Sequence, residues 1–187
     1  FLVFSVPELT VPQWRDISAN AGCCFAAELR EDGSLAPLPR AGRSYYPEEL
    51  SELMKYKGKT NADFTRLLLH CARAVSGFAQ SDAPLTVLDP MCGKGTTLFC
   101  ALEEGDHAVG MDVDAKALLE ADQLLGRSLK MNRLKHKREE SSLTVPKGKP
   151  VRSVGYRLST SIEGWKNGDE RTFRLLNGDL GVLPAVM

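Results

Sequence analysis

The chain has 187 residues, of which 43 % are apolar and 26 % charged, values that fit one globular domain or one domain with an appendage. The net charge is zero, so only a local cluster could indicate a nucleic-acid partner, and no apolar run approaches the roughly 18 residues that cross a membrane. Five cysteines without a CxxC pair argue against a disulfide framework or a zinc site, and they indicate reduced thiols in a cytoplasmic protein.

Residues 1–46 form an N-terminal extension of mixed character. FLVFSV predicts a strand, and the glycines and prolines between Gly33 and Gly42 predict a loop. The chain begins at Phe1 rather than Met and ends at LPAVM. We therefore expect a fragment of a longer protein, with residues 47–187 forming a cofactor-binding domain truncated at its C-terminus.

Helical patterns begin at Pro47. PEELSELMKY has a proline and two glutamates at its start, the residues preferred there. After a break at KGKT, Asn61 can cap a second helix whose apolar residues recur at 64, 67, 68, 71 and 75. This spacing predicts a helix with Cys71 in the core.

The next segment alternates strands and helices. LTVLD at 85–89 predicts a buried strand, and a helix follows the glycine loop and ends at Gly105. HAVGMDVD predicts a second strand beginning at His107, and AKALLEADQLLGRSLKMNRL predicts a second helix. This order is the opening of a parallel α/β sheet, which binds ligands beyond the carboxyl ends of its strands.

Residues 127–170 form a basic insertion before the third strand. Residues 127–157 contain ten Lys or Arg and only two acids, Glu139 and Glu140. VRSVGYRLST can form a strand, and FRLLNGD is the better candidate for the third strand of the sheet. The basic stretch RSLKMNRLKHKR is either a solvated surface or a source of attraction to phosphates, with Tyr156 and Trp165 as the nearby aromatic residues.

LDPMCGKGTT at 88–97 has the composition of a loop that cradles a cofactor. A phosphate-binding loop needs G-x-x-x-x-G-K-[ST], but here Lys94 lies between the two glycines. A dinucleotide loop needs G-x-G-x-x-G, but Leu98 occupies the third glycine position, and Asp89 would face a pyrophosphate. The sequence therefore fits a loop for a cationic cofactor better than a phosphate-binding loop or a dinucleotide loop.

S-adenosylmethionine fits the acidic residues better, because it carries an ammonium and a sulfonium and no phosphate. Asp89 can attract the ammonium, while Gly93 and Gly95 let the backbone approach the ligand. The helix that starts near Thr96 offers free N–H groups to the carboxylate of the methionine part. Asp112, twenty-three residues after Asp89, ends the second strand and can accept hydrogen bonds from the ribose hydroxyls.

LDPMCGKGTT followed by VGMDVDAKAL resembles the class I S-adenosylmethionine-dependent methyltransferases, and Asp-Pro-x-Cys-Gly-x-Gly-Thr resembles those that methylate base amino groups in tRNA, rRNA or DNA. The resemblance implies a Rossmann-like, doubly wound, mostly parallel sheet. It implies Asp179 of Asn177-Gly178-Asp179 as the contact to the adenine amino group. YKGKTNADFTRLLLHCA resembles the segment that closes over the methionine end. The further contacts that the resemblance implies are Pro90, Met91, Cys92, Val113, Thr60, Asn61 and Phe64.

The same subgroup carries its catalytic residues in a [DNS]-P-P-[YFW] tetrapeptide, which this sequence does not contain. The catalytic residues are therefore unknown. We expect a methyltransferase in which a base amino nitrogen attacks the methyl carbon. A non-catalytic module that binds nucleic acid or protein, and a small-molecule methyltransferase, remain as alternatives. The sequence does not determine the target base, DNA versus RNA, or the oligomeric state.

Overall fold

The computed structural model describes residues 3–19, 23, 25–39, 45–47, 50–79, 81, 83–146 and 148–182. Contacts between residues divide the chain into two compact units, Phe1–Arg43 and Ser44–Met187. Glu48 and Glu49, which we expect at a helix start, lie outside the described residues, as does the terminal stretch 183–187. Among the described residues, no helix has the length and apolar character needed to cross a membrane.

The first unit contains a helix, α1 (Val11–Ala19), and a hairpin of β1 (Ala27–Leu29) and β2 (Leu35–Pro37). The turn of the hairpin contains Gly33, whose φ of 81° favours glycine. The Trp14 indole N–H donates to the carbonyl of Pro39 at 3.0 Å and so ties α1 to the residues after β2. Residues 3–6 have no regular secondary structure, so the strand expected in FLVFSV is not found there.

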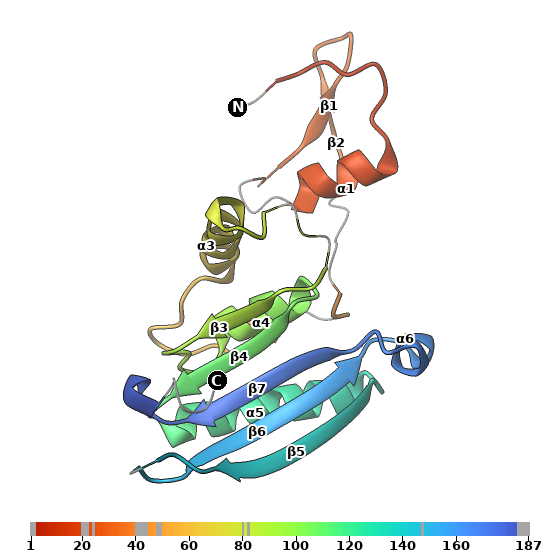
Figure 1. Cartoon of the computed structure of the whole chain (residues 1–187). Coiled ribbons are helices and arrows are strands. Elements are labelled where there is room, and N and C mark those ends of the chain that lie inside the picture. Colours follow the sequence, from red (N-terminus) through yellow and green to blue (C-terminus); the bar gives the residue numbers. More distant parts are fainter. Residues whose placement is uncertain are drawn as a thin grey trace. The chain divides into compact units, whose positions relative to one another are not determined.

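The second unit is an α/β fold built on one five-stranded sheet (Figure 1). Its elements, in chain order, are α2 (Leu50–Leu53), α3 (Ala62–Val75), β3 (Thr86–Asp89), α4 (Thr96–Glu103), β4 (His107–Asp112), α5 (Ala115–Met131), β5 (Lys135–Leu143), β6 (Val151–Ser159), α6 (Ile162–Asn167), β7 (Arg171–Asn177) and the short 3₁₀ helix η1 (Leu180–Val182). The strands and helices expected between residues 85 and 131 are confirmed.

The sheet is mixed and has the strand order β3-β4-β7-β6-β5. The pairs β3–β4 and β4–β7 are parallel, whereas β7–β6 and β6–β5 are antiparallel. β7 is therefore the third parallel strand, as expected, but the sheet is not mostly parallel. The strand order also differs from that of doubly wound nucleotide-binding sheets. The reason is that the basic segment, expected as an insertion, forms the β5–β6 hairpin and extends the sheet.

The main apolar core lies on one face of the sheet. α4 and α5 cover this face in Figure 1, and Leu98, Leu102 and Leu125 are fully buried there. Phe99 of α4 stacks on Phe173 of β7 with ring centroids 5.5 Å apart. The opposite face has a smaller cluster of buried residues, made of Val109, Met111, Val145, Val151 and Leu176. Both helices of the β–α–β–α segment thus pack on the same side of the sheet.

α3 carries its apolar residues on the outside. Ala62 and Thr65 are buried, but Phe64 is 53 % exposed and Val75 is 88 % exposed. Cys71 is also exposed, so its expected place in the core is wrong, whereas Cys100 is buried as expected. β3 is an edge strand with an alternating, half-exposed pattern, so the strand expected there is found but its expected burial is wrong. The described part of the chain covers neither the apolar side of α3 nor the free edge of β3.

Replacing Phe99 by alanine tests the main core. The change removes a buried ring that stacks on Phe173. We expect the free energy of unfolding to fall by about 3–5 kcal/mol in urea titrations followed by circular dichroism. Phe78→Ala is the matched control, since that ring is 62 % exposed, and it should change the free energy by less than about 0.5 kcal/mol. Equal effects of the two changes would contradict this description of the core.

Candidate functional site

The ends of the three parallel strands bring polar side chains to one edge of the sheet. Asp89 ends β3 and lies level with Gly110 of β4, while Asp112 ends β4 and lies level with Asn177 of β7. The glycine loop, residues 90–95, begins at the end of β3 and leads into α4. In parallel α/β sheets this edge is where ligands bind. The sequence-predicted acids Asp89 and Asp112 are thus brought to the same edge.

The two glycines of the loop have backbone conformations that side chains disfavour. Gly93 has φ 52° and Gly95 has φ 86°, both in the left-handed region. Gly95 is also the N-cap residue of α4, so Thr96 is the first helical residue, as expected. No atom lies within 4 Å of the position that a Cβ on Gly93 would take. A ligand could therefore approach the loop backbone closely at Gly93.

Asp112 holds the loop against the end of β4. Its Oδ2 accepts a hydrogen bond from the Gly93 N–H at 2.7 Å, and its Oδ1 accepts one from the Asp114 N–H at 2.9 Å. The Cys92 N–H donates to the Met111 carbonyl at 2.9 Å. An ionised carboxylate has about four acceptor positions, so Asp112 keeps capacity for further donors.

Gly110 lets the glycine loop pack closely against β4, although it is not among the site residues predicted from the sequence. A Cβ at Gly110 would lie 2.4 Å from the Leu98 side chain and 2.7 Å from Sγ of Cys92. The loop and the start of α4 therefore pack directly on the β4 backbone. A glycine inside an apolar strand signals such an approach, and HAVGMD contains that signal.

The end of β7 completes the edge. The Asn177 side-chain amide donates to the carbonyls of Asp112 and Val113 at 3.0 and 3.2 Å, and the Gly178 N–H donates to Asp112 at 3.1 Å. Asp179 follows and accepts from the Gly181 N–H at 2.7 Å, starting η1. Asn177, the last residue of β7, is thus a structural support. The sequence motif Asn177-Gly178-Asp179 contains it but gives it no role of its own.

The remaining loop contacts differ in exposure. Met91 and Val113 are exposed at 73 % and 70 %, and both follow the carboxyl end of a parallel strand. Pro90 is half-buried, and the Met91 N–H donates to Oδ1 of Asp89 at 3.1 Å. Met91 and Val113 are therefore free to contact a ligand at this edge.

Cys92 is a structural residue of the loop. Its side chain packs toward Gly110 and is buried. Burial, reinforced by the negative charges of Asp89 and Asp112, raises the pKa of its thiol to about 12. The thiol therefore stays protonated at neutral pH and is a poor nucleophile. The same two carboxylates give the loop a negative local potential, which suits a cationic ligand.

α3 runs beside α4 in the same direction. The Cys100 thiol contacts the carbonyl of Ala62 at 3.8 Å, Arg66 pairs with Glu103 at 2.7 Å and, farther along, His70 pairs with Glu104 at 2.8 Å. The start of α3 therefore lies beside the middle of α4, and residues farther along α3 lie beside the end of α4.

Thr60 and Asn61 immediately precede α3, whose first residue, Ala62, contacts Cys100 in the middle of α4. Asn61 caps α3, because its side-chain oxygen accepts from the Phe64 N–H at 2.8 Å. That hydrogen bond confirms the expected capping role. Phe64 is 53 % exposed, and Thr60 is exposed as well.

Some of the cations in the basic insertion are paired with acids. Arg138 makes two hydrogen bonds with Asp122 at 3.1 and 2.8 Å, Arg152 pairs with Glu140 at 2.7 Å, and Lys137 pairs with Glu139 at 2.6 Å. Tyr156 is buried and donates to Asp122 at 2.5 Å, so its ring cannot stack on a base. Pairing of this kind weakens the attraction that the sequence composition suggests for phosphates.

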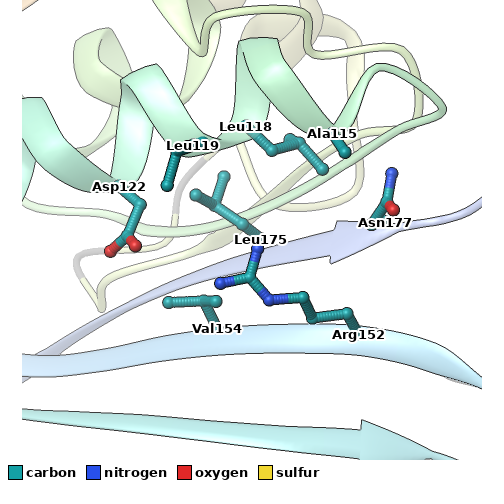
Figure 2. Close-up of a pocket in the computed structure, with 8 residues that line it drawn as sticks. All are labelled: Ala115, Leu118, Leu119, Asp122, Arg152, Val154, Leu175 and Asn177. Atoms are coloured by element: carbon teal, nitrogen blue, oxygen red, sulfur yellow. The ribbon is translucent and has the colours of Figure 1, made fainter.

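A small pocket opens between α5 and the strands β6 and β7, and it reaches the end of β7 at Asn177 (Figure 2). Leu118 and Leu175 line it together with Asp122, Arg152 and Asn177. Asp122 is already engaged by Arg138 and Tyr156, and Arg152 by Glu140. We therefore place the candidate site at the strand ends, where carboxylates and free backbone groups converge, rather than in this pocket.

Within the described residues, no group of three or more His, Cys, Asp or Glu side chains could hold a metal ion. Comparisons of the chain with protein-family models, with curated proteins and with solved structures give no match. The functional interpretation therefore depends on the geometry at the strand ends and on the sequence resemblance.

Gly110→Ala tests the contact between the loop and β4. The new methyl group would collide with Leu98 and Cys92, so the loop or α4 must shift. We expect the free energy of unfolding to fall by about 1–3 kcal/mol, the usual cost of overpacking. Gly155→Ala is the control, since no atom lies within 4 Å of the position that its Cβ would take and its φ is unexceptional. Thermal unfolding that is unchanged in Gly110→Ala would show that the loop does not pack there.

The His70–Glu104 pair predicts a pH-dependent contribution to stability. The hydrogen bond that His70 donates to the Glu104 carboxylate raises the pKa of His70 above its usual 6.5. Stabilisation is therefore fully present below that usual value and is lost as pH rises through the higher folded-state pKa. We expect His70→Gln to destabilise the chain at pH 5.5 and to cost less at pH 8.5, measured by urea unfolding. His136→Gln, which removes an imidazole bound to the Leu134 carbonyl, is the control. A cost that does not vary with pH would contradict the pairing.

Proposed function

We propose that this chain binds S-adenosylmethionine at the ends of β3, β4 and β7 and belongs to a methyltransferase that acts on base amino groups of nucleic acid. The observation that carries the proposal is the joint placement of Asp89, the glycine loop and Asp112 at one sheet edge. When bound, the cofactor supplies an electrophilic methyl group. A Rossmann-like class I arrangement of the sheet is part of the same proposal.

The donor set fits this cofactor in charge. Asp89 and Asp112 favour a cationic ligand, and Cys92 between them stays neutral. The first N–H groups of α4 lack acceptors within the helix and can meet a carboxylate. The absence of a Cβ at Gly93 leaves open space beside the loop backbone.

Each residue would have a separate role in binding. Asp89 would attract the ammonium, and the free N–H groups at the start of α4, beginning with that of Thr96, would hold the carboxylate. Gly93 and Gly95 would let the ligand come close to the loop backbone. Asp112 would accept from the ribose hydroxyls, while Val113 and Asp179 would contact the adenine. Thr60, Asn61 and Phe64 would close the methionine end. Asn177 and Gly110 support this set without touching the ligand.

The nucleic-acid substrate, whether tRNA, rRNA or DNA, is supported by the Asp-Pro-x-Cys-Gly-x-Gly-Thr resemblance. Cations of the β5–β6 hairpin are paired with acids, which weakens their attraction to phosphates. The proposal of a nucleic-acid substrate therefore rests on the motif rather than on the basic stretch. A non-catalytic binding module is the second candidate, because the sequence contains no [DNS]-P-P-[YFW] tetrapeptide.

Calorimetric titration with S-adenosylhomocysteine tests the site. We expect binding by the wild type and at least tenfold weaker binding by Asp112→Ala, because the change removes the ribose acceptor and the anchor of Gly93. Asp32→Ala is the matched control, since Asp32 is also an exposed acid that accepts from a nearby backbone N–H, here that of Ser34. Absence of binding, or equal binding by Asp112→Ala, would refute the site.

A methyl-transfer assay separates the two candidate functions. The chain is incubated with S-adenosylmethionine labelled in its methyl group and with tRNA, rRNA or DNA. Label in nucleic acid supports the enzyme, whereas cofactor binding without transfer shows that this chain is not catalytic by itself.

A further inference from the structure

Lys94 is the one charged residue between Pro90 and Gly95, and its ammonium is held by groups outside the loop. Its Nζ lies 2.5 Å from Oε2 of Glu120 on α5 and 4.5 Å from the centroid of the Tyr56 ring. The Lys94 side chain is 27 % exposed, so the pair is partly shielded from water. Lys94 thus joins the loop to α5 and to the segment between α2 and α3.

The segment that carries Tyr56 is itself held in place. Lys59 pairs with Glu52 of α2 at 2.9 Å, and the Lys59 N–H donates to the Tyr56 carbonyl at 3.2 Å. Gly58 in this turn has φ 85°. The Tyr56 ring is therefore supplied to Lys94 by a fixed turn, and a cation on an aromatic face is attracted by the ring electrons.

A lysine in this loop is unfavourable for a cationic ligand. S-adenosylmethionine carries a net charge of +1, while S-adenosylhomocysteine is neutral overall. An uncompensated ammonium close to the loop would repel the first and leave the second almost unaffected. The loop nevertheless contains Lys94, so its charge has to be neutralised for the loop to accept a cation.

We propose that Glu120, with the Tyr56 ring, neutralises and holds Lys94 and thereby sets the preference of the loop for a cationic over a neutral ligand. Lys94 and Glu120 are positioning residues, because neither needs to touch the ligand. The inference rests on the proposed cofactor site and adds to it a determinant of selectivity between the cofactor and its demethylated product.

The test measures dissociation constants of both ligands by calorimetry and compares their ratio among variants. In Glu120→Gln, the charge of Lys94 is unmasked while the shape is kept. The preference for S-adenosylmethionine should fall roughly three- to tenfold, as for unit charges about 10 Å apart at effective dielectric constants of about 25–50. Lys94→Met should shift the ratio in the opposite direction, and the double variant should return it close to the wild-type value.

Two controls separate charge from structure. Glu163→Gln makes the same change on α6, which precedes β7 and so lies at the opposite edge of the sheet, and it should leave the ratio unchanged. Sinefungin, a cofactor analogue with an amine in place of the methylated sulfur, should follow S-adenosylmethionine, because it has the same net charge. Tyr56→Leu should lower the preference, and Tyr56→Phe, which keeps the ring, should not.

Each outcome bears on a different proposal. If the wild type binds neither ligand, both the cofactor site and this inference are wrong. If it binds both but Glu120→Gln leaves their ratio unchanged, or weakens both equally, Glu120 only supports the fold and this inference alone is overturned. A ratio that shifts in opposite directions in Glu120→Gln and Lys94→Met supports it.

Discussion

The candidate site depends on the contact between the glycine loop and the backbone of β4 at Gly110. Because Gly110 has no side chain, Cys92 and Leu98 pack directly on the strand, and the loop backbone comes within reach of Asp112. The hydrogen bond from the Gly93 N–H to a carboxylate is charge-assisted, which makes it stronger than a neutral one. The left-handed conformations of Gly93 and Gly95 follow from this path. A bulkier residue at 110 would disturb all of these features together.

The electrostatic arrangement of the second unit separates charges by location. Acids lie at the ends of the parallel strands, whereas the arginines of the β5–β6 hairpin are paired with acids on the same hairpin, on α5 or just before β7. The cation within the loop is also paired, with Glu120. The edge of the sheet is therefore negative in spite of a neutral sequence, and a ligand with positive charge is favoured there over a phosphate.

Local patterns in the sequence predict the strand–loop–helix core well. The alternation of apolar segments and glycines between residues 85 and 131 corresponds to β3, α4, β4 and α5, because each pattern spans a whole element. Asp89, Asp112 and the two loop glycines could be chosen as candidate site residues because they lie directly after the predicted strands. Cys92 could be judged unreactive, and its burial agrees with that judgement.

Other features depend on contacts that a single sequence does not display. KHKREESSL has too many charges to indicate a strand, and its burial does not alternate, yet it pairs with β6 along its whole length. Arg138 from this strand bonds to Asp122 on α5. The amphipathic spacing of α3 predicts an apolar face correctly, but it cannot tell which face packs. Here Arg66 and His70 bind α4, so the polar side points inward. The Lys94–Glu120 pair likewise joins residues from two separate elements.

The outward apolar face of α3 has a practical consequence for solution conditions. Exposed apolar patches and free strand edges favour association between molecules, and excluded salts such as sulfate strengthen it. The same salts screen the pair of Lys94 and Glu120, which is partly exposed. Higher ionic strength thus strengthens association through the apolar face of α3 and weakens the Lys94–Glu120 pair. Raising it promotes self-association through α3 and weakens the attachment of the loop to α5, so dilute buffer of low ionic strength suits both.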